Sequence, residues 1–378
     1  MKNRNIWLIT GVILATVIFV LISQKGTNTK ETVKIGNILY MPGPLAALGE
    51  QELNGMKMAE EHINANGGIK GKELEIVTQD YAGDSKKAVA AYELLKTQKI
   101  NSILIDGGSA VSSVIPLIRQ DGVFSMVPVA VTPTYFDNNQ KTCRIAVTAD
   151  RYAAGIGDYL TKNFENPRIS FLVSANEYGN AVRSEVTKVL EKNNGSVVIS
   201  ETYESAASDF RTQITKIKEN QDEIDALIII NANSSIEPML RQVRQLGFNK
   251  LIIADTFTIL NPALKDLSAA EGVVFVDYSF GSQPDQGDTE AMANFKKEFY
   301  SKYVSYPGVA AINGYDSVMI IAKAMNNVNN INPKSITDYI TNTKFSILDG
   351  EIGFNSDCEV DREIEMRVIK GGVITSVK

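Results

Sequence analysis

Short runs of apolar residues alternate with longer amphipathic stretches along most of the chain. The short runs are rich in β-branched side chains and end at polar or turn-forming residues, which is typical of strands. The stretches between them repeat apolar residues every three or four positions, which predicts helices that pack one face against a core. The predicted strands occupy residues 33–40, 74–78, 102–105, 124–127, 169–173, 196–200, 226–230 and 251–254.

Several of the predicted strands are apolar on both faces. The run Leu227-Ile228-Ile229-Ile230 has no polar position at all, as expected of a central parallel strand that helices cover on both sides. Strands of this kind joined by helices predict right-handed βαβ units in an α/β fold with doubly wound parallel sheets. Some 345 residues of this pattern are too many for a single sheet, so we expect two lobes.

Composition and charge agree with a globular protein that does not bind nucleic acid. The 378 residues are 44% hydrophobic and 22% charged, close to the average for soluble proteins. The net charge is -6, and without residues 1–30 the chain keeps 34 basic against 44 acidic residues, or -10. An acidic body without a basic stripe does not favour phosphates, so no nucleic-acid partner is predicted.

The start of the chain carries the pattern of an export or anchoring segment. Lys2 and Arg4 precede residues 6–22, which contain no charged side chain. Basic residues before an apolar run stay cytoplasmic, so the body is expected to be extracytoplasmic, in the periplasm or at the cell surface. The length fits either a cleaved signal peptide or an N-terminal apolar helix that contacts the membrane as an anchor, and we favour the anchor slightly. No cysteine follows the run, which excludes the usual bacterial lipoprotein attachment.

Scarcity of histidine and cysteine limits the chemistry. The only histidine, His62, falls late in an amphipathic stretch, where we predict an exposed residue with a structural role. A zinc site needs clustered His and Cys, and a Ser-His or Cys-His nucleophile needs an imidazole base, so no metal and no catalytic residue is predicted. Cys143 and Cys358 are 215 residues apart, and the sequence leaves open whether they form a disulfide.

Motifs for cofactors are missing as well. The glycine-rich string at residues 67–71 follows a predicted helix instead of a strand, and no Walker A or Gly-x-Ser-x-Gly motif occurs. No cofactor is therefore predicted. Acidic residues alternate over positions 357–363 but lack the glycine and spacing of an EF-hand, so we expect an exposed acidic turn and an edge strand there.

The segment that follows the predicted strand 102–105 is the best candidate for a ligand site. Gly107 and Gly108 allow a close backbone approach, and we predict that Ser109 is the N-cap of the next helix. Free amides and the dipole at a helix N-terminus attract a carboxylate. A capped helix without any ligand remains the alternative.

Several motifs resemble the type I periplasmic binding proteins of the leucine/isoleucine/valine-binding kind, which serve branched-chain amino acid ABC transporters. The most specific is Ile63-Asn64-Ala65-Asn66-Gly67-Gly68-Ile69-Lys70-Gly71, followed by Asp80 and Asp84; Gly43-Pro44-Leu45-Ala46 and Glu177-Tyr178-Gly179 match as well. The resemblance covers residues 33–378. It implies two doubly wound lobes joined by three hinge crossovers. Lobe 1 would comprise residues 33–148 and 279–352, and lobe 2 residues 149–278 and 353–378.

The resemblance also implies where a ligand lies. Gly108 or Ser109, with backbone groups of Val129 and Val131, would hold its carboxylate on lobe 1, and Tyr178 would close over it from lobe 2. This sequence departs from the family at several positions, three of which bear on the ligand. Leu48 replaces an aromatic wall residue, Val131 replaces a threonine that helps to hold the ammonium, and Thr256, beside Asp255, replaces the acidic partner of the ammonium.

Together these features predict an extracytoplasmic solute-binding protein with an ABC permease as partner. The expected ligand is an amino acid or a related small carboxylate or amide, bound between lobes that close on it. A sensor ectodomain that acts through a partner receptor is the alternative, because it would use the same fold and the same closure. An enzyme is not predicted, since no nucleophile motif or phosphate loop is present.

Overall fold

The computed structural model describes residues 31–131, 142–231, 233–261, 263–278 and 288–377. By its contacts, the chain from residue 33 onward forms one compact unit. The predicted apolar helix over residues 6–22 lies outside the described residues. Within the described ranges, no helix combines the length and hydropathy needed to cross a membrane.

Five strands form the first sheet, in the order β2-β1-β3-β4-β5. The pairs β1–β3, β3–β4 and β4–β5 are parallel. All four strands predicted before residue 128 are present, and β3 and β4 have the predicted bounds. The strands are β1 (Thr32–Leu39), β2 (Glu73–Asp80), β3 (Ser102–Ile105), β4 (Phe124–Val127) and β5 (Thr142–Arg144).

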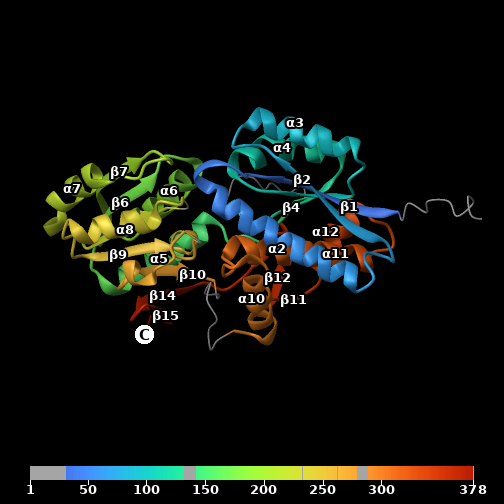
Figure 1. The fold of residues 1–378 in the computed structure, drawn as a ribbon. Helices are drawn as coiled ribbons and strands as arrows, with labels where there is room; N and C mark the ends of the chain where they lie inside the picture. The colour runs from blue at the N-terminus through green and yellow to red at the C-terminus, as the bar shows by residue number, and fades with distance from the viewer. Residues whose placement is uncertain (1–30, 132–141, 232, 262, 279–287, 378) are drawn as a thin grey trace, which may run out of the picture. The chain divides into compact units, whose positions relative to one another are not determined.

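Seven strands form the second sheet, in the order β15-β14-β10-β9-β8-β6-β7. Strands β6 to β10 are mutually parallel, whereas β14 and β15 add an antiparallel edge. Figure 1 shows the C-terminal strands β14 and β15 beside β10. The strands are β6 (Arg168–Ser174), β7 (Ser196–Tyr203), β8 (Ala226–Ile230), β9 (Leu251–Asp255), β10 (Val274–Asp277), β14 (Glu365–Lys370) and β15 (Val373–Ser376).

A small antiparallel sheet contains β11 (Phe345–Ile347), β12 (Gly350–Phe354) and β13 (Val360–Asp361). Strand β13 pairs with β12, and the preceding turn exposes Asp357. The predicted acidic turn and short strand over residues 357–363 are therefore confirmed.

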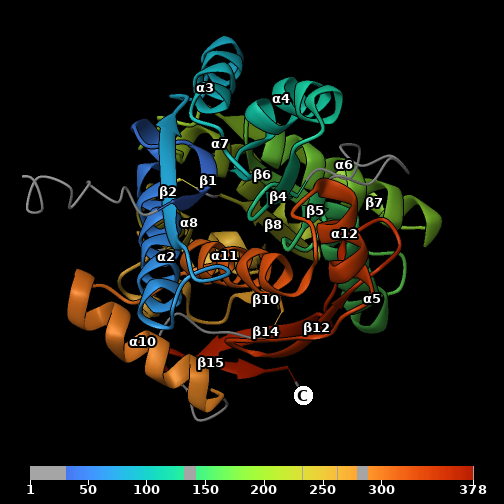
Figure 2. The same cartoon turned by 90° about the vertical axis from the view of Figure 1, so that its right-hand side faces the viewer.

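Helices cover the sheets, as the apolar spacing predicts. Helix α2 follows β1, and α11 packs along α2 (Figure 2). The two helices approach closely because Gly55 carries no side chain: a Cβ there would lie 1.9 Å from the Ala311 carbonyl oxygen. The helices are η1 (Gly43–Leu45), α2 (Ala46–Ala65), α3 (Ser85–Thr97), α4 (Gly108–Asp121), α5 (Ala149–Asn163), α6 (Glu177–Lys192), α7 (Arg211–Glu219), η3 (Gln221–Glu223), α8 (Ile236–Gln245), α9 (Thr256–Ile259), η4 (Leu267–Ala270), α10 (Glu290–Tyr303), α11 (Val309–Asn327) and α12 (Pro333–Thr341).

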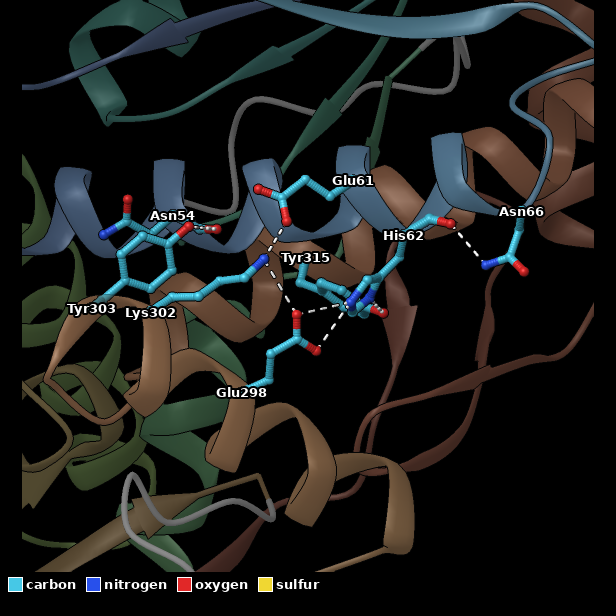
Figure 3. Close-up of polar contacts among 8 residues, drawn as sticks. All are labelled: Asn54, Glu61, His62, Asn66, Glu298, Lys302, Tyr303 and Tyr315. Atoms are coloured by element: carbon cyan, nitrogen blue, oxygen red, sulfur yellow. Dashed lines mark hydrogen bonds and ion pairs between the residues drawn. The ribbon is translucent and has the colours of Figure 1, made fainter.

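His62 connects three of these helices (Figure 3). Its Nδ1 lies 2.9 Å from the hydroxyl of Tyr315 on α11, and its Nε2 lies 3.1 Å from a carboxylate oxygen of Glu298 on α10. Lys302 pairs with Glu298 at 3.3 Å and also with Glu61. The prediction of an exposed His62 is wrong, because the side chain is only 33% exposed; its contacts do support a structural role.

The two cysteines, whose pairing the sequence left open, form a disulfide. Cys143 on β5 and Cys358 before β13 have Cα atoms 4.6 Å apart. The Arg144 amide also donates to the Cys358 carbonyl at 2.9 Å. The chain passes from the first sheet to the second after β5, leaves the second sheet after β10 and returns to it at β14. The disulfide therefore joins the first of these passages to the last.

Candidate functional site

A cavity of about 390 Å³ lies between loops of the first and second sheets. Most of its residues stand in the loops that follow the carboxyl ends of strands, where doubly wound proteins place their ligands. The first sheet and the start of α2 provide most of the wall, and the loops after β6, β7 and β9 complete it. The lining residues are Tyr40, Leu45, Leu48, Gly49, Glu52, Tyr81, Gly83, Asp106, Gly107, Gly108, Ser109, Val129, Ala130, Val131, Asn176, Glu177, Tyr178, Ser205 and Phe257.

Most of the residues predicted from the sequence lie around this cavity. The residues that line it are Leu48, Gly108, Ser109, Val129, Val131 and Tyr178. Asp255 and Thr256 are fully buried and stand behind the wall. The structure thus brings together the residues expected to hold a carboxylate, whereas Thr256 and Asp255, at and beside the position of the ammonium's acidic partner, lie outside the lining.

The start of α4 differs by two residues from the prediction. The N-cap is Gly107, with φ of 82°, so Ser109 lies inside the first turn and is not the cap. Glycine is required at residue 107 because this φ is unfavourable for other residues, and because a Cβ there would lie 2.0 Å from the Tyr81 hydroxyl. The Ser109 hydroxyl hydrogen-bonds to Tyr81. The first-turn amides of α4 remain at the cavity wall, since Gly108 and Ser109 both line it.

Val129 and Val131 follow β4 on the same wall. Val129 packs with Leu48 and Tyr178 in a small apolar cluster that includes residues from both sides of the cavity. The carbonyl of Val131 accepts a hydrogen bond from the Ala149 amide at 2.9 Å, at the start of α5. One backbone group that the resemblance implies for ligand contact is therefore already engaged.

Tyr178 lies at the start of α6. The helix is capped by Asn176, whose Oδ1 accepts from the Gly179 amide at 2.9 Å. The Tyr178 ring meets the Phe257 ring edge to face, with centroids 5.8 Å apart, and its hydroxyl donates to Asp255. Burial, reinforced by the Asp255 carboxylate, raises the pKa of Tyr178 well above its ordinary value. Tyr178 is therefore held as a neutral hydrogen-bond donor.

Asp255 and Thr256 have partners within the protein. Asp255 Oδ1 accepts from the Thr258 amide at 2.8 Å and caps α9, while Oδ2 accepts from Tyr178. Thr256 donates its hydroxyl to the Val276 carbonyl at 2.7 Å. Burial raises the pKa of Asp255, while its hydrogen bonds oppose that rise. Both side chains stabilise the second sheet instead of facing the cavity.

Two acidic residues of the cavity wall were missed by the sequence analysis. Glu52 on α2 is 1% exposed, and Asp106 directly follows β3. Their carboxyl groups share a hydrogen bond. Asp106 could have been found from its place at the carboxyl end of a strand, but nothing near Glu52 in the sequence indicates its partner.

Aromatic rings form much of the remaining wall. Tyr40 and Tyr81 meet edge to face with centroids 5.9 Å apart. Burial raises the pKa of Tyr81, and the nearby Asp106 carboxylate adds to the effect. The described residues contain no group of three or more His, Cys, Asp or Glu side chains placed to hold a metal ion. The arrangement suits an organic ligand with an apolar body and a few polar groups.

Comparisons with known proteins agree with this arrangement. A family model described as "Periplasmic binding protein" matches residues 32–368. The chain is 24% identical over 332 residues to the leucine-, isoleucine-, valine-, threonine- and alanine-binding protein of Pseudomonas aeruginosa, a match that covers 86% of each chain.

Solved structures share the fold. A branched-chain amino acid transporter substrate-binding protein of Streptococcus pneumoniae, in complex with isoleucine, matches with a TM-score of 0.77 and 21% identity, over 92% of this chain and 98% of that one. A solute-binding protein of an ABC transporter from Rhodopseudomonas palustris, in complex with 3,4-dihydroxybenzoic acid, matches with a TM-score of 0.79 and 21% identity, over 92% and 96%.

Proposed function

Because the chain belongs to the periplasmic binding protein family, in its type I form, we propose that it is the solute-binding protein of an ABC transporter. It binds a small organic solute, undergoes no reaction with it, and delivers it to a membrane permease. The observation that carries this proposal is the cavity lined by loops of both sheets at the carboxyl ends of their strands.

The ligand is an amino acid or a related small carboxylate or amide. Two structural neighbours hold carboxylates of quite different shape, isoleucine and 3,4-dihydroxybenzoic acid. In this chain the carboxylate docks on Gly108 and Ser109, where the first-turn amides and dipole of α4 favour a negative charge. Leu48, Val129 and the aromatic rings of the wall enclose the apolar part of the ligand.

Binding is coupled to closure of two lobes. The lobes comprise residues 33–148 with 279–352, and residues 149–278 with 353–378, and they pivot on the three passages between the sheets. A ligand that touches Ser109 on one side and Tyr178 on the other stabilises the closed state, because each contact is complete only there. The permease then recognises the closed form.

The body is extracytoplasmic. The disulfide between Cys143 and Cys358 supports this location, since such bonds persist in oxidising compartments. Residues 6–22 direct the chain across the membrane and serve as its anchor there.

The function is tested by identifying what the protein binds. Small molecules released from protein purified under native conditions are analysed by mass spectrometry, and the hits are titrated by calorimetry alongside L-leucine and L-isoleucine. We expect a small carboxylate or amide to copurify or to bind, with compaction detected by X-ray scattering. A protein that releases no such molecule, binds none of those tested and keeps its scattering profile would overturn the proposal.

A further inference from the structure

The carboxyl groups of Glu52 and Asp106 form a pair at the cavity wall. Glu52 Oε1 and Asp106 Oδ1 are both buried, and neither accepts a hydrogen bond from a donor group of the described residues. A proton shared between the two carboxyl groups accounts for this, since two ionised carboxylates cannot remain in contact. Both residues also line the cavity, so the pair lies in the cavity wall.

Burial disfavours ionisation of both carboxyl groups of the pair. Burial raises the pKa of Asp106 to about 6 against the lowering effect of the Gly107 amide and Glu52. Burial, together with the Asp106 carboxylate, raises the pKa of Glu52 well above its ordinary value. Sharing one proton leaves the pair with one negative charge, and the described residues of the cavity lining hold no cationic side chain beside it.

No Lys, Arg or His occurs among the described residues that line the cavity. Its ionisable acidic side chains are Glu52, Asp106 and Glu177. A carboxylate ligand without a positive charge would be attracted only by the helix dipole of α4, which is equivalent to roughly half a charge. The acidic side chains of the wall would repel it. A ligand with a positive charge of its own compensates the negative charge of the cavity wall, because buried charges are stable only when paired.

Asp255 does not supply the carboxylate that would pair with a cationic ligand. It is fully buried, and both of its oxygens already accept hydrogen bonds, from Thr258 and Tyr178. The pair of Glu52 on α2 and Asp106 after β3 is a buried acidic group of the cavity wall, and no cationic side chain among the described residues lines the cavity beside it.

We infer that Glu52 and Asp106 form the recognition site for a protonated amino group of the ligand. This inference rests on the proposed function and deepens it: the cavity selects solutes that carry an N–H-bearing cation, such as amino acids, over carboxylates that lack nitrogen. The ammonium donates to the carboxyl pair, while the ligand carboxylate lies at the start of α4, where Ser109 follows Asp106 by three residues.

Three probes that share one carbon skeleton separate the contribution of the ligand's amino group from that of its carboxylate. L-Leucine has both charged groups, 4-methylpentanoate has only the carboxylate, and 3-methylbutylamine has only the amine. In calorimetry with the full chain, leucine is expected to bind roughly 30-fold or more tightly than 4-methylpentanoate, as for other buried hydrogen-bonded charge pairs. Equal affinity of leucine and 4-methylpentanoate would overturn the inference but leave the proposed function intact. Binding of none of the three would also count against the inference, whereas the proposed function fails only if no copurified or titrated solute binds.

A fourth probe tests the role of hydrogen bonding. Trimethylated leucine keeps the positive charge but has no N–H donor, so it cannot donate to the carboxyl oxygens. We expect its affinity to fall to that of 4-methylpentanoate or below. Undiminished binding would contradict an ammonium site made by the carboxyl pair and would favour recognition by aromatic faces alone.

Asp106→Asn and Glu52→Gln locate the selectivity in the pair. Each variant is expected to lose the preference for leucine over 4-methylpentanoate, while the affinity for 4-methylpentanoate stays the same or rises. Asp121→Asn is the matched control, because it removes a carboxylate at the far end of α4 that pairs with Lys96 at 2.6 Å. Thermal unfolding checks that each variant is folded. A folded Asp106→Asn variant with unchanged preference would overturn the inference, as would the same loss in Asp121→Asn.

Discussion

Tyr178 donates its hydroxyl hydrogen bond to Asp255, a fully buried carboxylate at the end of β9. One side chain therefore has two contacts of different kinds. Its ring packs toward the cavity with Leu48 and Val129, and its hydroxyl satisfies a carboxylate behind the wall. Because Asp255 also caps α9 through Thr258, this hydrogen bond fixes the position of the ring on the second sheet.

Removal of the hydroxyl alone should separate these two roles. Tyr178→Phe leaves Asp255 with one donor fewer, which should lower the free energy of unfolding by about 1–3 kcal/mol while ligand affinity changes little. Tyr178→Ala also removes the ring and should impair ligand-induced closure more than docking, as measured by X-ray scattering with and without ligand. Tyr300→Phe is a suitable control, since Tyr300 is 44% exposed on α10. Normal compaction in Tyr178→Ala would argue against a closing role.

The start of α4 yields a second prediction. Ser109→Ala should weaken binding of a carboxylate ligand by about 1–3 kcal/mol if the hydroxyl donates to the ligand. Ser112→Ala, on the exposed side of the same helix, is the control and should bind normally. Calorimetry with both variants measures the difference, and unchanged affinity in Ser109→Ala would remove that hydroxyl from the site.

Gly107 should tolerate no side chain. Gly107→Ala places a Cβ 2.0 Å from the Tyr81 hydroxyl on a backbone with φ of 82°, so either Tyr81 moves or the start of α4 changes. Gly67→Ala is a matched control, because Gly67 also has positive φ but no atom within 4 Å of an added Cβ. We expect Gly107→Ala alone to lose ligand affinity, whereas both variants should lose some stability from backbone strain. Equal affinities in the two variants would contradict a role for the Tyr81 contact in shaping the site.

The disulfide should contribute substantially to stability. Cys143 and Cys358 close a loop of 215 residues, and restriction of the unfolded chain on that scale is worth roughly 3–5 kcal/mol. Cys143→Ser/Cys358→Ser should lower the free energy of unfolding by about that amount in urea titrations. Reductant should destabilise the parent protein and leave the double variant unchanged. A parent protein that is insensitive to reductant throughout unfolding would contradict the prediction.

The strands were predictable because central parallel strands are apolar on both faces, so runs such as residues 226–230 stand out from any helical pattern. Strands β14 and β15 were not found in this way, because they lie at an antiparallel edge: β14 mixes charged with apolar residues, and β15 mixes hydroxyl-bearing with apolar residues. The resemblance placed Leu48 and Tyr178 at the cavity, where the structure has them. It could not indicate the pairing of Glu52 with Asp106, which depends on how α2 lies against the end of β3.

Buried Asp316 yields a prediction about pH. It is 1% exposed on α11, and burial raises its pKa to about 8, although Arg362 opposes the shift. An unfolded aspartate titrates near pH 4, so between about pH 4 and pH 8 the native state holds a proton that the unfolded state has lost. The stability from this group is fully present below about pH 4 and is lost as pH rises through about 8, with a slope of at most about 1.4 kcal/mol per pH unit.

Asp316→Asn removes this titration while it keeps an acceptor for the Leu348 amide, which donates to Asp316 Oδ1 at 3.3 Å. Urea denaturation from pH 5 to pH 8 should therefore show a shallower loss of stability in the variant than in the parent protein. Some loss should remain, because burial also raises the pKa of Asp277 to about 7. Asp338→Asn, which removes an exposed carboxylate that pairs with Lys334 on α12, should leave the slope unchanged. Identical slopes in Asp316→Asn and the parent protein would mean that Asp316 is ionised in the folded state across this range.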